Sequence, residues 1–221
     1  MMMTPNPSPV RESDRVETEL RQLILTLELE PGLAISEATL MKDYGWGRTP
    51  LRDAIQRLAE QSLLQIIPRQ GIVVTALSVF DFAEMMDAMS MVIGPAAALA
   101  CERLTDGELD QLSEVVDASE SAAEEGNFIK VSLLDFEFHR VLADATGNRH
   151  LSRYLLHLHQ VATRFNFGGW TRDRNAAPSI DEHRQIVEIM RQRDVTGAKS
   201  TMLKHIENAR RRIVGTMVVG A

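Results

Sequence analysis

The sequence lacks several features that mark particular classes of protein. It contains one cysteine, so no disulfide can form within the chain. Because Cys101 follows an apolar run at residues 96–100, a buried structural thiol is favoured over a nucleophile. Aromatic residues make up only 5% of the chain, whereas methionines number 11. This composition favours helices packed through adaptable side chains over a β-sandwich.

The longest apolar run of the sequence does not suggest a membrane span. The longest apolar stretch, residues 88–101, is too short for that purpose and is interrupted by Gly94-Pro95. Residues 1–9 have neither the charged nor the apolar part of a signal peptide, so we expect a disordered tail there. These absences predict a cytoplasmic protein with no membrane partner.

The chain also lacks the positive charge that is common among nucleic-acid binders, since its net charge is −7. Its positive charge is local, because residues 42–71 hold 5 Lys or Arg against 3 Asp or Glu. This distribution fits a protein that reads a DNA groove with one small surface and whose affinity depends on dimerisation. The 221 residues, 44% of them hydrophobic, suffice for one small and one larger domain, each with its own core.

Residues 36–75 have the pattern of a helix-turn-helix followed by a two-stranded wing. Ser36 is suited to cap a short helix, which the glycine-rich residues 44–47 then end. Thr49 has the hydroxyl expected of the next N-cap, and a proline follows it. Residues 68–71 have the composition of a hairpin turn. The wing strands are expected at residues 64–67 and 72–75.

The second helix of this motif and the wing hold the candidate DNA contacts. Arginine can bond two acceptors on a guanine edge in the major groove, and a wing tip can enter the adjacent minor groove. A solvated helix face would explain any single arginine, but the cap, proline, arginines and wing in this order favour DNA binding. The predicted contacts are Arg48, Thr49 and Arg52 on the helix, with Arg69, Gln70 and Gly71 in the wing.

Residues 23–75 resemble the winged-helix domain of GntR-family transcription regulators. The likeness rests on Leu-Glu-Pro-Gly at 29–32, on Gly-Arg-Thr-Pro-Leu-Arg-Asp-Ala-Ile-Gln-Arg-Leu at 47–58, and on the wing glycine. Gly47 stands where these proteins usually have serine, which would remove one phosphate or cap contact. Trp46 stands where they usually have a smaller apolar residue. The resemblance implies a DNA-binding transcription regulator.

From residue 77 onward the signals are helical. Six helices are expected, beginning after Ser78, Thr105, Asn127, Asn148 and Ser179 and near Asp194, with Glu108 and Glu182 completing two capping boxes. Glycines are expected to end three of them, at Gly126, Gly147 and Gly168-Gly169. We therefore predict a mainly α protein. A winged helix-turn-helix domain at residues 10–76 precedes an antiparallel bundle of about six helices at residues 77–221, which would bind an effector and dimerise.

Four residues of the bundle form a candidate metal site. Asp135 and His139 are four apart on one predicted helix and share its face, and His183 and His205 lie on the last two helices. An aspartate with three imidazoles would suit zinc, nickel, manganese or iron without selecting among these divalent metals. Spacing alone is weak support, because Asp-x₃-His pairs are common on exposed helices.

The C-terminal part resembles the metal-binding FCD ligand-binding domain of the FadR branch of the GntR family. The matching residues are Asp-Phe-Glu-Phe-His at 135–139, Gly147-Asn148, Glu-His-Arg-Gln-Ile at 182–186, and His205. The likeness implies that Asp135 and the three histidines bind an ion, and that the effector is a small organic acid. The short chain and six helices suggest the VanR-like subgroup. Ser90 and Gly94 stand where such domains usually have arginine and glutamate.

Four polar residues are candidate effector contacts, although a solvated helix side would explain each one singly: Arg140, Arg164, Asn208 and Arg212. His157 and His159 are expected to be surface or packing residues, because residues two apart on a helix face different ways.

These patterns predict a ligand-responsive transcription regulator. In the family it resembles, such a protein is most often a repressor that binds an inverted-repeat operator in double-stranded DNA as a homodimer. Two alternatives stay open. The metal could be the signal itself, as in a metal sensor, or the metal could serve an enzyme by activating water or dioxygen. Glu137 is poorly placed as a catalytic base, because it points away from the face shared by Asp135 and His139.

Overall fold

The computed structural model describes residues 11–68 and 71–219, which divide into two compact units. The smaller unit reaches Ile24 and continues from Glu28 to Ala76, and the larger unit takes Leu25–Leu27 and the chain from Leu77 onward. The tail expected at residues 1–9 and the wing-tip residues Arg69 and Gln70 lie outside the described residues.

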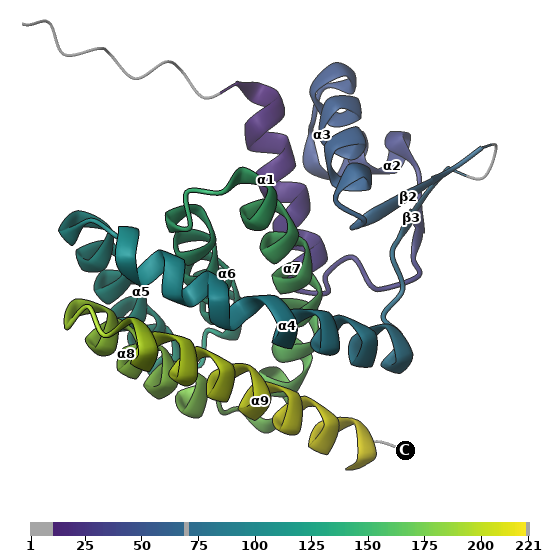
Figure 1. Ribbon diagram of the computed structural model, residues 1–221. Coiled ribbons are helices and arrows are strands. Elements are labelled where there is room, and N and C mark those ends of the chain that lie inside the picture. The colour runs from purple at the N-terminus through teal and green to yellow at the C-terminus, as the bar shows by residue number, and fades with distance from the viewer. Residues whose placement is uncertain (1–10, 69–70, 220–221) are drawn as a thin grey trace, which may run out of the picture. The chain divides into compact units, whose positions relative to one another are not determined.

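The smaller unit contains the predicted helix-turn-helix and wing (Figure 1). Ser36 caps the first helix of the motif by accepting a hydrogen bond from the amide of Thr39, and Gly45 ends this helix with a φ of 71°. The elements run in the order α1 (Glu12–Leu25), β1 (Ala34–Ile35), α2 (Glu37–Tyr44), α3 (Arg48–Glu60), β2 (Leu64–Ile67) and β3 (Gly71–Val74).

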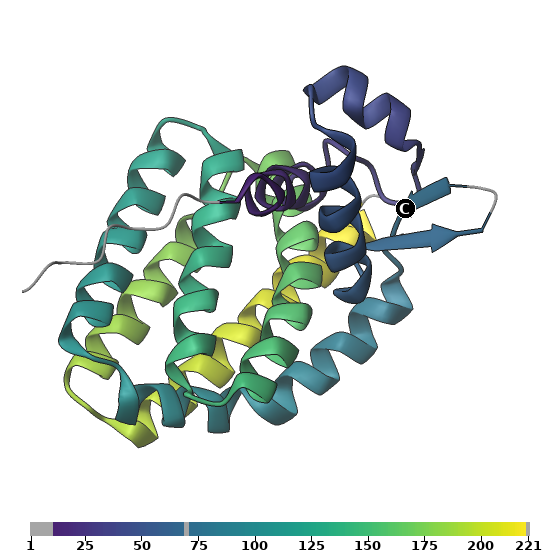
Figure 2. The same ribbon diagram turned by 90° about the horizontal axis from the view of Figure 1, so that it is seen from above.

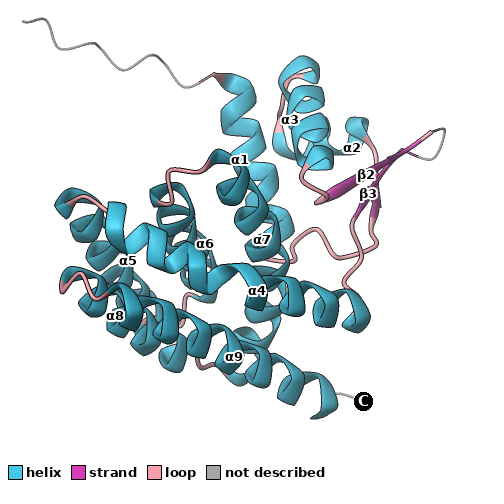
Figure 3. Ribbon diagram, in the orientation of Figure 1, coloured by secondary structure: helices cyan, strands magenta, loops and turns pink. Residues whose placement is uncertain are grey.

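The wing belongs to a sheet of three strands in the order β1-β3-β2, and these are the strands drawn in Figure 3. β2 and β3 pair antiparallel from Leu64 opposite Val74 to Ile67 opposite Gly71, as a hairpin requires. The two-residue strand β1 was not predicted, because two residues carry no alternating pattern. Gly71 has a φ of 99°, and a Cβ there would lie 3.2 Å from the carbonyl oxygen of Ile35. Glycine is therefore required locally by the sheet itself.

The predicted start of α3 is wrong by two residues. The N-cap is Gly47, which has no side chain to bond the first amides, and Thr49 is already inside the helix. Pro50 still falls in the first turn, where its missing N–H has no intrahelical acceptor to lose. The apolar face is as expected from helical spacing, and its buried residues are Leu51, Ala54, Ile55 and Leu58.

Trp46 fills the core of the smaller unit, and this explains why the turn accepts so large a residue. Its side chain is 3% exposed, its ring stacks on Tyr44 at 4.7 Å between centroids, and its Nε1 donates to Glu19 Oε2 at 2.7 Å. A buried indole N–H needs such an acceptor. This bond joins the turn to α1, a helix whose bounds were not predicted from the sequence.

The larger unit is a bundle of six helices among the described residues, which confirms the predicted fold class (Figures 1 and 2). α4 packs against α6, α7 and α9, and α5 packs against α6 and α8. Figure 1 shows α4 and α9 side by side and running in opposite directions. The helices are α4 (Val79–Arg103), α5 (Asp106–Glu124), α6 (Phe128–Ala145), α7 (Arg149–Asp173), α8 (Ala177–Arg191) and α9 (Val195–Val219).

Four of the helix caps expected in the larger unit are confirmed. Thr105 and Glu108 form a capping box at the start of α5, each bonding the other's backbone amide. Ser78, Asn127 and Asn148 each accept at least one amide from the first turn of the helix that follows.

In the larger unit, two expected helix boundaries are wrong. α7 continues through Gly168-Gly169 to Asp173, which allows the indole of Trp170 to be buried to 6% exposure. Packing of this side chain outweighs the low helix propensity of the two glycines. α8 begins at Ala177 rather than after a capping box at Ser179. The Glu182 carboxylate is instead bonded to the last helix.

α4 has the length and apolar composition of a membrane-crossing helix, and it is the only helix of that kind in the described part of the chain. Within the bundle, 44% of its apolar window is buried. A helix that packs against three neighbours has the same composition, and α4 supplies core residues such as Phe82, Met89 and Ile93. Packing therefore accounts for its apolar character.

Candidate metal centre and nucleic-acid interface

Three histidines from three helices meet in the core of the bundle. His139 of α6, His183 of α8 and His205 of α9 are between 3% and 4% exposed, and one nitrogen atom of each lies within 4.8 Å of the others. The closest pair is His183 Nε2 and His205 Nε2, 3.3 Å apart. Helical packing has brought together the three imidazoles proposed as ligands from the sequence.

Asp135 lies at the edge of this cluster. It precedes His139 by about one turn of α6, is 5% exposed, and places Oδ1 3.7 Å from His183 Nε2. Burial raises the pKa of Asp135 to about 7, although Arg212 acts in the opposite direction. A carboxyl with such a pKa changes its charge easily near neutral pH, and a bound cation would favour its ionised form.

The electrostatic state of the imidazoles suits metal binding. Burial, reinforced by neighbouring histidines, holds the pKa of His139 and of His183 well below the usual value. Both rings are therefore neutral at pH 7, which is the form that coordinates a metal. His139 Nδ1 is buried and has no hydrogen-bond partner among the described residues. A buried nitrogen without a partner costs free energy, and an ion would supply what is missing.

Aromatic rings hold two of the imidazoles in place. Phe138 stacks on His183 with centroids 4.0 Å apart and planes 10° from parallel. His159 of α7 stacks on His139 at 3.9 Å and 14°. His159 is 3% exposed, so the expectation of a surface or packing residue holds only for packing. Burial lowers its pKa to about 3. Its spacing of four from the buried Leu155 was the signal that could have placed it on the inner face.

Glu182 lies in the hydrogen-bond network beside the histidine cluster and not in the helix-capping box expected from the sequence. Its Oε2 lies 2.7 Å from His205 Nδ1, so it accepts the proton of that nitrogen and leaves Nε2 directed at the cluster. Asn208 Nδ2 donates to Oε1 at 2.7 Å. Arg212 donates to both carboxylate oxygens, at 2.8 and 2.9 Å. Burial raises the pKa of Glu182, but the bonds from His205 and Arg212 outweigh it and hold this pKa well below the usual range.

The four candidate effector contacts lie in three different environments. Asn208 and Arg212 belong to the network around Glu182. Arg164 is 1% exposed, and burial lowers the pKa of its guanidinium to about 10. Arg140 instead pairs with Glu137 and Asp144 of its own helix, on a partly exposed surface. The geometry therefore gives Arg140 a local role, and an effector contact there stays a prediction.

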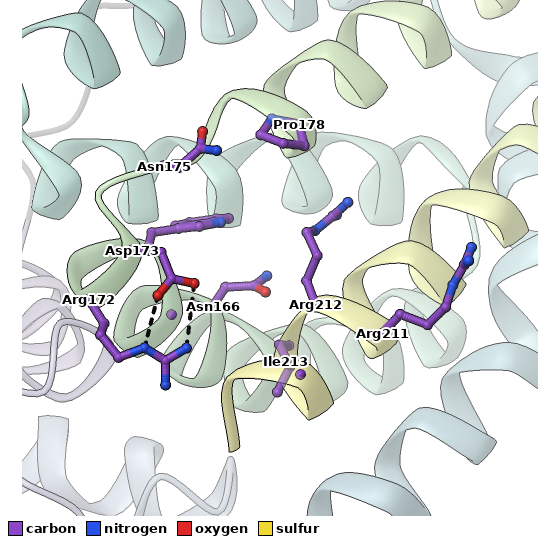
Figure 4. Close-up of a pocket in the computed structure, with 11 residues that line it drawn as sticks. Asn166, Arg172, Asp173, Asn175, Pro178, Arg211, Arg212 and Ile213 are labelled. Carbon is purple, nitrogen blue, oxygen red and sulfur yellow. Dashed lines mark hydrogen bonds and ion pairs between the residues drawn. The ribbon is translucent and has the colours of Figure 1, made fainter. Parts of the chain in front are cut away.

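A cavity of about 450 Å³ opens between the end of α7, the start of α8 and α9 (Figure 4). Its lining includes Arg212, so one residue belongs both to the cavity wall and to the network around the histidine cluster. The other residues labelled in Figure 4 are Asn166, Arg172, Asp173, Asn175, Pro178, Arg211 and Ile213. The volume is in the range of small-molecule sites in proteins.

In the smaller unit, α3 exposes its polar face as expected for a helix that enters the major groove. Arg48, Thr49 and Arg52 are exposed. Arg52 Nε lies 2.8 Å from Glu37 Oε2, so α2 holds this side chain while it stays 60% exposed. Arg57, also on α3, pairs with α1 instead and has a structural role.

Two family models match the chain. The model described as "Bacterial regulatory proteins, gntR family" covers residues 12–74, and the model described as "FCD domain" covers residues 84–208. The two matches fall on different units of the structure.

Curated relatives and solved structures agree with these matches. The uncharacterized HTH-type transcriptional regulator YdhC of Bacillus subtilis is 28% identical over 86% of this chain and 85% of its own length. The HTH-type transcriptional repressor NanR of Cronobacter sakazakii is 31% identical over 62% of this chain and 59% of its own. The structure of E. coli McbR/YncC superposes with a TM-score of 0.82 at 19% identity, covering 94% of this chain and 99% of that one, which shows the fold.

The buried cluster predicts how the stability of the metal-free protein depends on pH. His139, His159 and His183 have lowered pKa values, so each takes up a proton on unfolding at acid pH. Asp135 acts in the opposite direction, because its pKa of about 7 lets the folded state keep a proton that the unfolded chain has lost. Near pH 5.5 the three histidines would take up about three protons on unfolding, and Asp135 would release about one. Unfolding then takes up about two protons in total, so the free energy of unfolding should fall as pH drops from about 7 to 5.

Urea unfolding of chelator-treated protein across this pH range measures the effect. His159→Phe should reduce the pH dependence by about one proton, because the folded protein keeps this imidazole neutral. A free energy of unfolding that stays level or rises towards pH 5 would contradict the neutral state assigned to the three imidazoles.

Proposed function

Because the chain belongs to the GntR family as a transcription regulator with an FCD ligand-binding domain, we propose that it is a repressor controlled by a small organic acid. Residues 10–76 would bind an inverted-repeat operator, and residues 77–221 would bind the effector and form a homodimer in the cytoplasm. The relatives are transcription regulators and not enzymes, so the enzyme considered from the sequence is excluded. The buried histidine cluster is the main observation that supports an effector site in the larger unit.

The proposal that the smaller unit binds DNA is supported by the exposed face of α3. Arg48 and Arg52 would reach base edges, and Thr49 would anchor the helix against the backbone. Gly47 leaves the first amides of α3 without a side-chain acceptor, and such amides suit a phosphate oxygen. Glu37 holds Arg52 through both carboxylate oxygens before DNA arrives, at 2.8 and 3.0 Å. The wing residues Arg69, Gln70 and Gly71 would contact the adjacent minor groove.

Dimerisation is supported by large apolar side chains left exposed on α4. Phe80 is 84% exposed, Met91 77% and Val79 60%. Exposed apolar side chains on a single helix favour a protein partner, and a second copy of the chain would match the two-fold symmetry of an inverted repeat.

In the larger unit, Asp135, His139, His183 and His205 would hold one divalent ion, such as Zn, Ni, Mn or Fe. When bound, the ion would offer open coordination positions to the carboxylate of an organic acid. Glu182 fixes the tautomer of His205, while Asn208 and Arg212 fix Glu182. The acid acts as an inducer only if it binds more tightly to a dimer geometry that no longer matches the operator.

A metal sensor is the second candidate. It is favoured by the burial of all four candidate ligands, which are between 3% and 5% exposed, since such a site would respond to the ion alone. Titration of metal into chelator-treated protein on operator DNA separates the two functions. DNA affinity that follows metal without any acid would identify a sensor.

Arg52→Ala should weaken binding to the specific operator by about 1–3 kcal/mol and relax selectivity at one base position. The reason is that Arg52 would make a two-acceptor contact to one base. Arg15→Ala, which removes an exposed arginine paired within α1, is the matched control and should leave specificity unchanged. Fluorescence anisotropy against a set of single-base operator variants measures both. Wild-type selectivity in Arg52→Ala would remove this residue from the base-reading set.

His183→Ala should lower metal affinity by at least about a hundredfold, because a direct ligand contributes more than the outer partners whose loss costs ten- to a hundredfold. The effector-free variant should still bind the operator, but acid should no longer release it. His150→Ala removes an exposed histidine and is the control. Calorimetry with metal and a DNA-release assay give the two readouts. A variant that binds metal and responds like wild type would contradict the assignment.

A further inference from the structure

The cavity between α7, α8 and α9 has the lining of an anion site. Three arginines and one aspartate line it, and that aspartate, Asp173, is bonded to Arg172. Asn166 and Asn175 add amide groups, and Trp170 adds an aromatic wall. In Figure 4, Asn166 of α7 and Arg212 of α9 face the cavity from different helices. An excess of cationic donors beside an aromatic surface suits a small organic anion.

Arg212 has donors to spare for such an anion. Its contacts with described residues are Nη1 to Glu182 Oε1, Nη2 to Glu182 Oε2, and Nη2 to Ser179 Oγ at 3.1 Å. Nε–H and one proton of Nη1 have no part in these bonds. The side chain is 30% exposed and reaches the cavity wall. A carboxylate could therefore bind Arg212 without displacing Glu182.

A continuous line of hydrogen bonds runs from the cavity wall to the histidine cluster. Arg212 donates to Glu182, and Glu182 Oε2 accepts from His205 Nδ1. His205 Nε2 then lies 3.3 Å from His183 Nε2. The charge of Arg212 is also felt beyond this line, since it opposes burial in setting the pKa of Asp135. Arg212 therefore influences both the network and the field at the cluster.

We propose that this cavity binds a small organic carboxylate on Arg212 and that the bound anion strengthens ion binding at the histidine cluster through Glu182 and His205. The coupling rests on the metal site proposed above, whereas the anion site does not. An anion at Arg212 would offset part of the positive charge that opposes a cation nearby. It would also leave Glu182 a stronger acceptor towards His205, which makes Nε2 a better ligand. Linkage requires the ion to strengthen anion binding by the same factor.

Benzoate and Zn²⁺ test this by calorimetry on the full chain, with benzamide as the uncharged match. Chelator-treated protein should bind one benzoate per chain, and benzamide at least about tenfold more weakly. Saturating benzoate should raise Zn²⁺ affinity by about fivefold, and Zn²⁺ should raise benzoate affinity equally.

Two variants and a matched control locate the anion. Arg212→Gln should bind benzoate at least about tenfold more weakly. Arg210→Gln, two residues away and paired with Asp87, should bind it like wild type. Asn166→Asp places a negative charge in the cavity without touching Glu182, so it should weaken benzoate binding and, by the same electrostatic coupling, raise Zn²⁺ affinity in the absence of benzoate.

The measurements distinguish failure of the anion site in the cavity from failure of the metal site. Normal Zn²⁺ binding with no benzoate binding, or with unchanged benzoate binding in both cavity variants, would overturn the cavity site alone. Benzoate that binds only to Zn²⁺-loaded protein and is lost in His183→Ala would mean that the anion binds the ion directly, which overturns the proposal. Absence of Zn²⁺ binding in wild type would overturn both the coupling and the metal site.

Discussion

The larger unit is organised around a set of polar groups buried in an apolar helical core. His139, His183, His205 and Asp135 are nearly inaccessible to water, yet burial of such groups is unfavourable unless each finds a partner. Packing supplies only part of what they need, because His139 Nδ1 has no partner among the described residues. A divalent ion would satisfy several of these groups at once. Its binding would therefore contribute directly to the stability of the bundle.

Residues around the cluster supply hydrogen-bond partners to some of these buried polar groups. Glu182 and His183 are adjacent on α8, so one points its carboxylate at His205 while the other enters the cluster. Arg212, two turns after His205, closes the network and also borders the cavity. In the smaller unit a neighbouring side chain also holds a charged residue in place, since Glu37 pairs with Arg52. The protein as a whole is acidic. Both proposed binding functions thus depend on a few charged side chains that neighbours hold in place.

The sequence predicted those parts of the structure that local rules decide. Helix starts with a side-chain cap, the wing hairpin and the buried face of α3 follow from short patterns. Where packing outweighs propensity, the prediction failed: α7 passes two glycines so that Trp170 is buried, and Glu182 leaves its expected capping box for His205. The buried position of His159 could not be decided from a spacing of two to His157, because burial depends on neighbouring helices. The cavity also arises only from the packing of three helices.

The proposed effector response depends most directly on an ion in the histidine cluster. Elemental analysis of the purified full chain, combined with its melting temperature before and after chelation, tests this claim in one preparation. We expect close to one divalent transition metal per chain and a melting temperature that falls on chelation and recovers when the metal is restored. Protein that retains no metal under any loading condition, and melts at the same temperature with and without chelator, would contradict the account.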